Sequence, residues 1–445
     1  MTRVPGDWRL PLPDIMLSNF QTRMATFAHY VNAPYVDFLK RLGLHFDVVS
    51  ARGTLIVDEN GNEYIDAIAG YGNLNIGHNH PKVIEAVVQQ LQSPQPFNWP
   101  FISAAHAHLA EELAQITPGD LECSLVVNSG SEAVDSVLKL VRLATGKPHV
   151  IGMRGAWHGF TFGAMSASDT VMCKGFEPML ADVTHVDYGN ASAVESAITD
   201  RTGAVLVEPI QAESGAIVPP PGYLSELADI CKRKEIILIF DEVKSGMAKS
   251  GRMFACEYDN AVPDVILIGK SLGGGAMPIG VITARRKVWK RFGFSFPMSS
   301  SSGAGNRLAC AAALATLGVI KDEGLCERAA RQGQRILEAA AQLVREFPAI
   351  VTGVTGRGLL IALHTAGLGA ATQILKECVH NRVLLMTAFG DRSRILIEPP
   401  LCISDSETER LLDALRAAIR VAAEKDPTKP LKTPPIPSSQ RTWHH

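Results

Sequence analysis

The sequence predicts an α/β protein built on a mostly parallel sheet with helices on both faces. The first observation is a set of short, unbroken aliphatic runs: SLVV at 124–127, AVLV at 204–207, IILIF at 236–240 and DVILI at 264–268. Such runs are typical of parallel strands that are covered on both faces. The second observation is that amphipathic segments lie between these runs. Alternating strands and helices indicate an α/β domain, in which ligands bind beyond the carboxyl ends of the strands.

The clearest predicted helix follows the first run and extends from Ser131 to Ala144. A serine opens it, and an acidic residue lies in its first turn. Four apolar residues recur in it at helical spacing: Val134, Val137, Leu138 and Val141. This part of the chain therefore predicts a strand, a tight glycine turn and a helix in succession.

The two ends of the chain differ from this central part. Residues 54–66, TLIVDENGNEYID, hold two β-favouring runs around Asn60 and Gly61, which predicts a hairpin. After Arg307 the chain becomes rich in Ala and Leu, which predicts helices leading into a C-terminal lobe, and the tail from Lys425 is polar and Pro-rich. We therefore divide the chain into an N-terminal segment (1–60), a large domain (61–340) and a C-terminal domain with the tail (341–445).

Length and charge narrow the classes of partner. With 445 residues, 46% of them apolar, the chain is long enough to form two or three lobes with their own cores. Its 43 basic and 45 acidic side chains give a net charge of -2, which argues against nucleic acid or an anionic membrane as the main partner. We therefore expect small-molecule partners.

The composition also indicates a compartment. The opening MTRVPGDWRLPLPDIML is interrupted by three prolines, so it lacks the apolar core of a secretory signal. No stretch approaches the roughly 20 apolar residues of a membrane span. The eight cysteines form no CxxC pair and no metal-like spacing with histidine, as expected for reduced thiols. We expect a cytoplasmic, metal-free protein.

Two ionisable residues stand at the ends of predicted strands. Asp241 directly follows IILIF, and Lys270 lies two residues past DVILI and opens the run KSLGGG. Taken alone, Asp241 is more often a helix cap or a solvated acid, and a lysine is usually a solvated charge. Together they suit a pyridoxal-5'-phosphate (PLP) site, where a carboxylate keeps the pyridine nitrogen protonated and a desolvated lysine forms an imine.

Gly130 and Ser131, within NSGSEA, begin a helix just after a strand. Backbone N–H groups and the positive end of the helix dipole bind phosphate at such positions. An ordinary capped helix is about as common an explanation for this motif by itself. The three strand-end features are much more specific together than any one of them alone.

Ordered motifs along nearly the whole chain resemble those of the class III, fold-type I PLP aminotransferases. The motifs are GYG...GHNHP (70–81), NSGSEA, RGAWHG, VEPIQAESG, PPPGYL, IFDEV, PDVILIGKSLGGG and EPPL (398–401). SGRMFACEY and GGGAMPIG look most similar to the putrescine-type diamine transaminases. The resemblance implies a large domain with a seven-stranded, mostly parallel sheet between helices and a smaller α+β domain made from both ends of the chain.

The resemblance also implies a role for each residue around the cofactor ring. Lys270 would bind PLP as a Schiff base and then shuttle the substrate proton, and Asp241 would pair with the pyridine nitrogen. Val243 would pack on one face of the ring and Trp157 would stack on the other. Without the flanking motifs, Val243 would be an ordinary strand-end aliphatic residue and Trp157 an ordinary core residue.

Further implied contacts lie around this ring. Gly130 and Ser131 would hold the phosphate, and Ser302 lies where the family has a threonine that reaches the phosphate of the neighbouring subunit, so a homodimer with shared active sites is expected. His158 is expected to orient other groups rather than act as a base. Glu208 and Glu213 can be buried structural acids, and the resemblance makes Glu213 a gate on the substrate side.

The chain departs from the family where substrates are recognised. The arginine expected at position 396 is Leu396, and leucine cannot supply a bidentate clamp for an α-carboxylate. The glutamine expected after DEV is Lys244, which either contacts the cofactor's phenolic oxygen or reaches a substrate carboxylate, as Arg394 also could. Other substitutions are Thr355 for an arginine, GMAK at 246–249 and SSSGAGNR at 300–307.

These features predict a ping-pong aminotransferase that moves an amino group from a diamine, an ω-amine or a larger amine-bearing metabolite to a keto acid such as pyruvate or 2-oxoglutarate. Racemases, aminomutases and decarboxylases on the same scaffold are the first alternative. A catalytically inactive relative is another. A nucleotide-binding dehydrogenase is disfavoured because the glycine runs lack a G-x-G-x-x-G at the first strand–helix turn.

Overall fold

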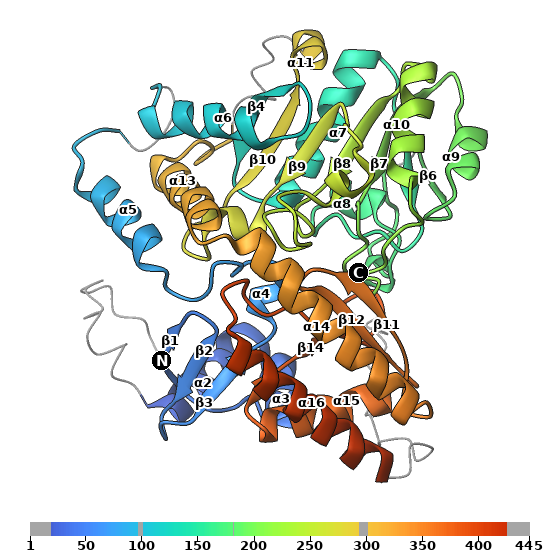
Figure 1. The fold of residues 1–445 in the computed structure, drawn as a ribbon. Coiled ribbons are helices and arrows are strands. Elements are labelled where there is room, and N and C mark those ends of the chain that lie inside the picture. The colour runs from blue at the N-terminus through green and yellow to red at the C-terminus, as the bar shows by residue number, and fades with distance from the viewer. Residues whose placement is uncertain (1–18, 97–100, 181, 293–300, 425–445) are drawn as a thin grey trace, which may run out of the picture.

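The computed structural model describes residues 19–96, 101–180, 182–292 and 301–424. One half of the molecule surrounds a seven-stranded sheet, and the other half holds two four-stranded sheets with the helices that cover them (Figure 1). The Pro-rich tail that the sequence predicts lies outside the described residues.

The large sheet has the order β4-β10-β9-β8-β7-β5-β6. Its strands are β4 (Leu121–Val127), β5 (His149–Met153), β6 (Val183–Val186), β7 (Thr202–Val207), β8 (Ile237–Asp241), β9 (Val265–Ile268) and β10 (Gly280–Arg285). Strands β5 to β9 pair in parallel, whereas β10 runs antiparallel to both β4 and β9. The predicted α/β class with a mostly parallel sheet is confirmed. Each of the four aliphatic runs overlaps one of its strands, and β8 and β9 begin one residue after the start of their runs.

Alternate residues of the central strands enter two separate cores. Leu206, Ile239 and Leu267 pack in the cluster that also contains Val134 of α7 (Gly130–Thr145). Their neighbours Val205, Leu238 and Ile266 pack in the cluster on the opposite face, which also contains Leu227 of α10 (Tyr223–Lys234). Burial on both faces explains why these strands appear in the sequence as unbroken apolar runs.

Helix α7 begins one residue earlier than predicted, at Gly130. The capping serine is Ser129, whose hydroxyl oxygen accepts a hydrogen bond from the Glu132 amide at 3.1 Å. Serine is a preferred N-cap residue, so Ser129 rather than Ser131 sets the start of the helix.

Other helices cover the large sheet or connect it to the rest of the chain. They are α4 (Ala69–Gly72), α5 (Pro81–Gln92), α6 (Ala104–Ile116), α8 (Phe162–Ala167), α9 (Ala191–Ala197), α11 (Arg286–Phe292) and α13 (Arg307–Asp322), with the short turns η2 (Val171–Cys173), η3 (Ala255–Asp259) and η4 (Lys270–Gly273).

The N-terminal sheet contains the predicted hairpin. Strands β2 (Leu55–Asp58) and β3 (Glu63–Asp66) pair antiparallel, and Oδ1 of Asp58 accepts hydrogen bonds from the Asn60 and Asn62 amides in the turn. The sheet also contains β1 (Val48–Arg52) and, from the far end of the chain, β13 (Val383–Leu384), which pairs in parallel with β3. Its helices are α2 (Phe20–Phe27), η1 (Ala28–Asn32) and α3 (Ala33–Leu42).

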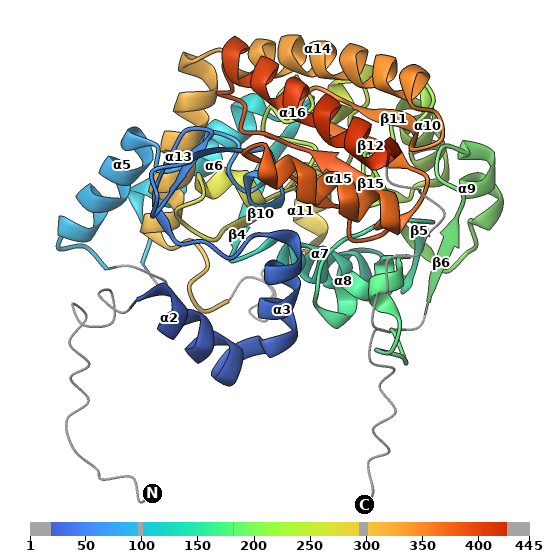
Figure 2. The same ribbon diagram turned by 90° about the horizontal axis from the view of Figure 1, so that it is seen from below.

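The C-terminal sheet has the order β11-β12-β15-β14, with strands β11 (Val351–Arg357), β12 (Leu360–Thr365), β14 (Met386–Thr387) and β15 (Arg394–Ile397). Helices α14 (Leu325–Glu346), α15 (Leu368–His380) and α16 (Asp405–Glu424) lie together over it (Figure 2). The β3–β13 pairing joins both ends of the chain, as expected for the smaller α+β part. The division at 60 and 340, which falls in the β2–β3 turn and inside α14, stays a prediction.

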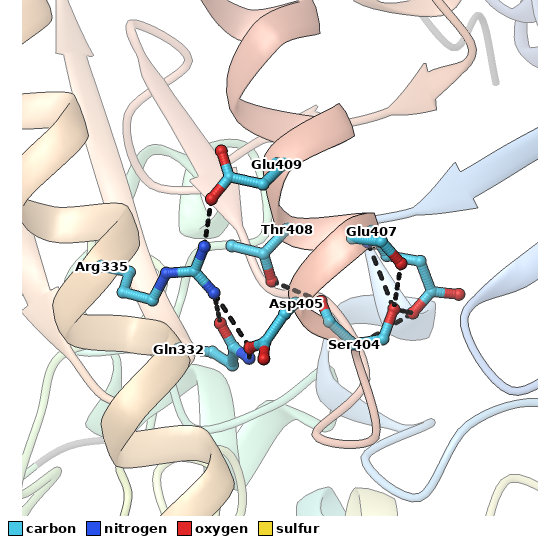
Figure 3. A network of polar contacts seen from close by, with 8 residues as sticks. Gln332, Arg335, Ser404, Asp405, Glu407, Thr408 and Glu409 are labelled. Carbon is cyan, nitrogen blue, oxygen red and sulfur yellow. Dashed lines mark hydrogen bonds and ion pairs between the residues drawn. The ribbon is translucent and has the colours of Figure 1, made fainter.

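Polar contacts fasten the start of α16 to α14 (Figure 3). The Ser404 hydroxyl accepts from the Glu407 amide at 3.2 Å, and the Glu407 carboxylate accepts from the Ser404 amide at 2.7 Å, which is a reciprocal helix cap. Arg335 of α14 pairs with Asp405 at 3.0 Å and with Glu409. The C-terminal helix is therefore held against the lobe at its first turn.

Within the described ranges, no helix is long and apolar enough to cross a membrane. Those same residues contain no group of three His, Cys, Asp or Glu side chains arranged to hold a metal ion.

Candidate active site

The carboxyl ends of β8 and β9 lie beside the start of α7. Parallel pairing sets Asp241, at the end of β8, opposite Leu267 of β9, and Lys270 follows β9 after Gly269. A Cβ atom on Gly269 would lie 3.3 Å from Cγ1 of Val243 and 3.6 Å from Cα of Gly130. The structure therefore brings Asp241, Val243, Lys270 and the N-terminus of α7 together, as the sequence predicts.

Asp241 is buried and hydrogen-bonded on both oxygens. Oδ2 lies 2.7 Å from Nδ1 of His158, and Oδ1 accepts from the Val243 amide at 3.1 Å. Burial lowers the pKa of His158, but the Asp241 carboxylate outweighs this effect and raises the pKa above its ordinary value. His158 Nε2 is also buried and has no hydrogen-bond partner among the described residues. His158 thus fixes the orientation of the Asp241 carboxylate.

Glu208 lies behind this pair. Its carboxylate accepts hydrogen bonds from the Trp157 amide at 2.9 Å and the Ala212 amide at 3.2 Å. Burial raises the pKa of Glu208 to about 7, and the Asp241 charge acts in the same direction. Glu208 therefore anchors the backbone that carries Trp157 and His158.

Lys270 is half-buried and has a φ of 45°, in the left-handed region that side chains rarely adopt. Burial lowers the pKa of its amine, and the neighbouring Lys244 cation lowers it further. A Cβ atom on Gly72 would lie 3.4 Å from Cγ of Lys244 and 3.8 Å from Cδ of Lys270. Both lysine stems therefore pass the same glycine, and Lys270 is the one suited to act as a nucleophile.

Lys244 is buried between two carboxylates. Its Nζ lies 2.5 Å from Oε1 of Glu213 and 3.0 Å from Oε1 of Glu398, and 5.7 Å from the centre of the Tyr71 ring. Burial opposes the charge on Lys244, but the two carboxylates raise the pKa of its amine above the ordinary value. Lys244 is therefore a fixed cation. We call Glu213, Lys244 and Glu398 the ion cluster.

Glu213 also holds a loop of the C-terminal sheet. Its Oε2 accepts from the Phe389 amide at 3.0 Å, and its carbonyl oxygen accepts from the Gly390 amide at 2.9 Å. Although burial acts in the opposite direction, Lys244 lowers the pKa of Glu213. Both oxygens of the Glu213 carboxylate thus have a hydrogen-bond partner.

The N-terminus of α7 carries the predicted phosphate-binding pair. Within the described residues, the amides of Gly130 and Ser131 donate no hydrogen bond, while the Ser131 hydroxyl accepts from the Phe160 amide at 3.1 Å. A Cβ atom on Gly130 would lie 2.8 Å from Cγ1 of Val243. Glycine at this position lets the helix end approach Val243 closely, and two N–H donors without a partner among the described residues lie at the positive end of the helix dipole.

Trp157 is almost fully buried, and its ring meets the ring of Phe160 edge to face at 4.8 Å. The predicted residue Ser302 is exposed, and its carbonyl oxygen accepts from the Asn128 side chain at 3.0 Å. The stacking role of Trp157 and the intersubunit role of Ser302 stay predictions.

The predicted substrate residues Arg394 and Leu396 lie on β15. The Arg394 guanidinium pairs with Asp391 at 3.0 Å, and Leu396, which is 1% exposed, packs in an apolar cluster with Ala212 and Ala216 on either side of Glu213. Thr355 donates a hydrogen bond to the Gly215 carbonyl at 2.6 Å. An apolar side chain thus occupies the position where the family clamp is expected.

Sequence reasoning missed four residues that adjoin the site. Glu398 appeared only within the EPPL motif, and Tyr71, Phe160 and Phe389 were not singled out. Phe160 directly follows the RGAWHG motif, so its place beside Trp157 could have been predicted from the sequence. The partner of Glu398 lies more than 150 positions away, and no local pattern indicates such a contact.

Comparison with known proteins gives the family. Residues 40–419 match the class-III aminotransferase family. The ornithine aminotransferase of Toxoplasma gondii ME49 is 30% identical, with a TM-score of 0.84 over 93% of this chain and 98% of that chain. Another structure of the ornithine aminotransferase from Toxoplasma gondii, with partial occupancy of PLP at its active site, is 30% identical, with a TM-score of 0.83 over 94% and 98%.

A transaminase from the marine bacterium Virgibacillus is 25% identical, with a TM-score of 0.83 over 91% of this chain and 99% of that chain. The family match covers most of the sequence, and it includes the strand ends that carry Asp241 and Lys270. The chain belongs to the class-III aminotransferase family and is a PLP-dependent transaminase.

Proposed function

We propose that this transaminase takes its amino group from a donor that is not held by an α-carboxylate, namely a diamine, an ω-amine or a larger amine-bearing metabolite. A keto acid such as pyruvate or 2-oxoglutarate accepts the amino group in the second half of a ping-pong cycle. The observation that carries the proposal is the ion cluster: Lys244, a cation that acts on Lys270, already pairs with the carboxylates of Glu213 and Glu398.

The residues present fit PLP. A Cβ atom on Gly130 would meet Val243, so glycine lets the start of α7 approach the site closely. The Gly130 and Ser131 amides donate no hydrogen bond to another described residue and would bind the phosphate. Lys270 would hold the aldehyde carbon, and Asp241 would face the ring nitrogen. When bound, PLP supplies an electron sink for the electrons of the broken C–H bond.

The protein moves the proton and fixes the charges. The Nζ atom of Lys270 takes the proton from the amine-bearing carbon of the donor, and its lowered pKa keeps part of the population neutral for that task. Asp241, which His158 orients, would lie beside the ring nitrogen. Val243 and Trp157 would confine the ring between them and so exclude water from both of its faces.

The absence of a carboxylate clamp supports the choice of donor. A bidentate arginine recognises a carboxylate through two parallel hydrogen bonds, and Leu396 is buried among apolar residues instead. The nearby Arg394 already pairs with Asp391. The resemblance of SGRMFACEY and GGGAMPIG to putrescine-type transaminases supports a donor whose amino group is terminal.

A homodimer is part of the proposal. Ser302 is exposed, and the family places the corresponding hydroxyl on the phosphate of the neighbouring subunit. Sedimentation analysis of the holoenzyme would give the mass of two chains, and Ser302→Ala would weaken PLP binding without separating the subunits.

The central test is a panel of amines with pyruvate and with 2-oxoglutarate as acceptors. Terminal amines are expected to give turnover, and α-amino acids are expected to be poor donors. A clear preference for ordinary α-amino acids would overturn the proposal. Adding donor without acceptor separates the reaction classes, because a transaminase leaves the cofactor in its stable amino form, whereas racemases and decarboxylases return it unchanged.

A further inference from the structure

An open cavity lies between the ends of α3 and α15, beside the N-terminal sheet. Its volume is about 470 Å³, within the range of roughly 300–1,000 Å³ that is usual for small-molecule sites. The two helices pack closely there, because a Cβ atom on Gly43, the C-cap of α3, would lie 3.5 Å from Cγ1 of Val379 in α15. The cavity shares none of the residues placed around Lys270, so neither PLP nor the amine donor accounts for it.

Basic side chains line this cavity. Lys40 and Arg41 come from the last turn of α3, Lys376 and His380 lie one turn apart on α15, and Arg382 follows that helix. None of the nine residues that line the cavity, all of them in the described part of the chain, is acidic. Four permanent cations therefore surround one hollow in a chain whose net charge is -2, and they attract anions to it. We call this hollow the basic cavity.

The helix dipoles explain only part of this charge. Basic residues such as Lys40, Arg41 and His380 are favoured in the last turn of a helix, where the dipole is negative. Carbonyls at the ends of both helices, however, already accept hydrogen bonds from backbone amides that follow them. Lys376 lies a full turn before the end of α15, and Arg382 lies outside the helix. The dipole accounts for neither of these two cations.

Arg382 is held in place by contacts that leave part of its side chain open. Its φ of 63° lies in the left-handed region, where residues other than glycine are rare. The guanidinium carbon lies 4.9 Å from the centre of the Tyr64 ring, and Nη1 donates a hydrogen bond to the Tyr64 hydroxyl. Tyr64 is buried and stacks on Phe46 at 4.5 Å. The Arg382 side chain is nevertheless 42% exposed, so a fixed guanidinium is available to an oxyanion.

The carboxylate next to Arg382 does not neutralise the basic cavity. Oδ2 of Asp58 lies 3.9 Å from Nη1 of Arg382, but this side chain is only 3% exposed and already accepts hydrogen bonds from the turn of its own hairpin and from Tyr64. Lys40 and Lys376 form no ion pair with another described residue. One buried carboxylate thus faces four cations, and the cavity keeps a positive charge.

We propose that the basic cavity binds an anion that carries a phosphate ester or a diphosphate group, at a site separate from the phosphate site of PLP. A single carboxylate would leave most of these cations without a counter-charge, whereas one phosphate ester carries about two negative charges. Guanidinium groups such as those of Arg41 and Arg382 bind phosphate oxygens through paired N–H groups, and lysines add point charges. Because the cations come from both helices, a bound anion would also stabilise the contact between α3 and α15.

The test uses the holoenzyme, in which PLP already occupies its own phosphate site. Calorimetry at low ionic strength follows the binding of inorganic diphosphate, of pyridoxine 5'-phosphate, which has no aldehyde to react with lysine, and of acetate. We expect a Kd for diphosphate below about 100 μM, which rises with added salt as the charges are screened, and no binding of acetate. Tighter binding of diphosphate than of pyridoxine 5'-phosphate would support a diphosphate-bearing ligand, and the reverse order a phosphate ester.

Lys232 offers a matched control, because it too lies in the last turn of a helix, α10, but outside the basic cavity. Lys40→Gln and Lys376→Gln should each raise the Kd for diphosphate about tenfold, and Lys232→Gln should leave it unchanged. Modification of the lysines by an amine-reactive reagent, read by peptide mass spectrometry, locates the ligand. Diphosphate should slow the modification of Lys40 and Lys376 but not that of Lys232.

Three results would overturn the proposal. The first is that neither diphosphate nor pyridoxine 5'-phosphate binds. The second is equal weakening by Lys376→Gln and Lys232→Gln, and the third is equal protection of all three lysines, because binding would then reflect surface charge in general. Amine turnover is expected to be unchanged in each variant, so the test is independent of the proposed function.

Discussion

Nζ of Lys244 lies 2.5 Å from Oε1 of Glu213, and both side chains are buried. Because Glu398 holds the same ammonium, Lys244 remains charged and has no lone pair with which to attack an aldehyde. This relationship distinguishes the two lysines of the site. Lys270 has a lowered pKa and is the proposed nucleophile, whereas the pKa of Lys244 is raised and its cation lies beside Lys270.

The first prediction concerns the covalent bond to PLP. Lys270→Ala should abolish the cofactor label that borohydride fixes on the protein, and Lys244→Gln should retain it. Intact-mass analysis after reduction measures both. Loss of the label in Lys244→Gln, with the fold preserved by circular dichroism, would show that the assignment of the two lysines is wrong.

The second prediction concerns the charge state of Lys270. The Lys244 cation lowers the pKa of the Lys270 amine, so Lys244→Gln should raise that pKa. Glu213 acts with the opposite sign, and Glu213→Gln should lower it. The pH dependence of Lys270 modification by an amine-reactive reagent in the apoenzyme, read by peptide mass spectrometry, gives the midpoints. Shifts in the same direction for both variants would contradict this electrostatic account.

The third prediction concerns the missing clamp. Leu396→Arg buries a guanidinium in an apolar cluster and should destabilise the protein by roughly 2–4 kcal/mol. The double variant Leu396→Arg/Lys244→Gln keeps the original net charge and frees Glu213, so it should lose less stability and gain turnover of α-amino acids. Denaturant unfolding and a donor panel measure the two effects, with Leu396→Met as the conservative control. Strict additivity of the stability changes would mean that the two positions are not coupled.

The fourth prediction concerns the close approach of α7 to Val243. Gly130→Ala places a Cβ atom 2.8 Å from Cγ1 of Val243 and displaces the helix end. Overpacking of about 1–3 kcal/mol corresponds to roughly 5- to 150-fold weaker PLP binding if the strain is borne by the holoenzyme. Gly318→Ala in α13 is the matched control, because a Cβ atom there meets no other atom within 4 Å. Equal PLP affinity in the two variants would exclude a role for this contact.

The fifth prediction concerns pH and stability. Burial raises the pKa of Glu208 to about 7 from 4.5, so between these values the folded protein binds more protons than the unfolded chain. The free energy of unfolding should therefore fall by up to roughly 3 kcal/mol as the pH rises from about 4.5 to about 7. Glu208→Gln should lack this part of the pH dependence, whereas Glu226→Gln on the exposed side of α10 should keep it. Urea unfolding at pH 5 and pH 8 tests the difference.

The sequence predicted those parts of the fold that depend on local pattern. The runs at 204–207, 236–240 and 264–268 could be predicted as strands because strands that are buried on both faces consist almost entirely of apolar residues. Strands β5 and β6 were not singled out, since HVIGM and VTHV mix polar and apolar residues. The antiparallel direction of β10 depends on pairing with β4 and β9, which local sequence does not encode.

In the site, too, the features that depend on local sequence could be predicted and those that depend on long-range contacts could not. Asp241 and Lys270 follow strands directly, so their convergence could be predicted from the topology of parallel sheets. The partners of Lys244 could not, because Glu213 and Glu398 come from different lobes and meet only after both have folded. The sequence left open whether Lys244 contacts the cofactor or the substrate. In the structure its ammonium is held by protein carboxylates.

Gly72 limits how the site can change by mutation or by design. Its φ of 82° and its missing side chain leave room for the stems of both lysines. A lysine introduced at position 244 of a related scaffold would need this glycine and the carboxylates at 213 and 398 to be present as well. These four positions are therefore expected to vary as a set among relatives, and a graft of Lys244 alone should yield a poorly folded protein rather than an altered specificity.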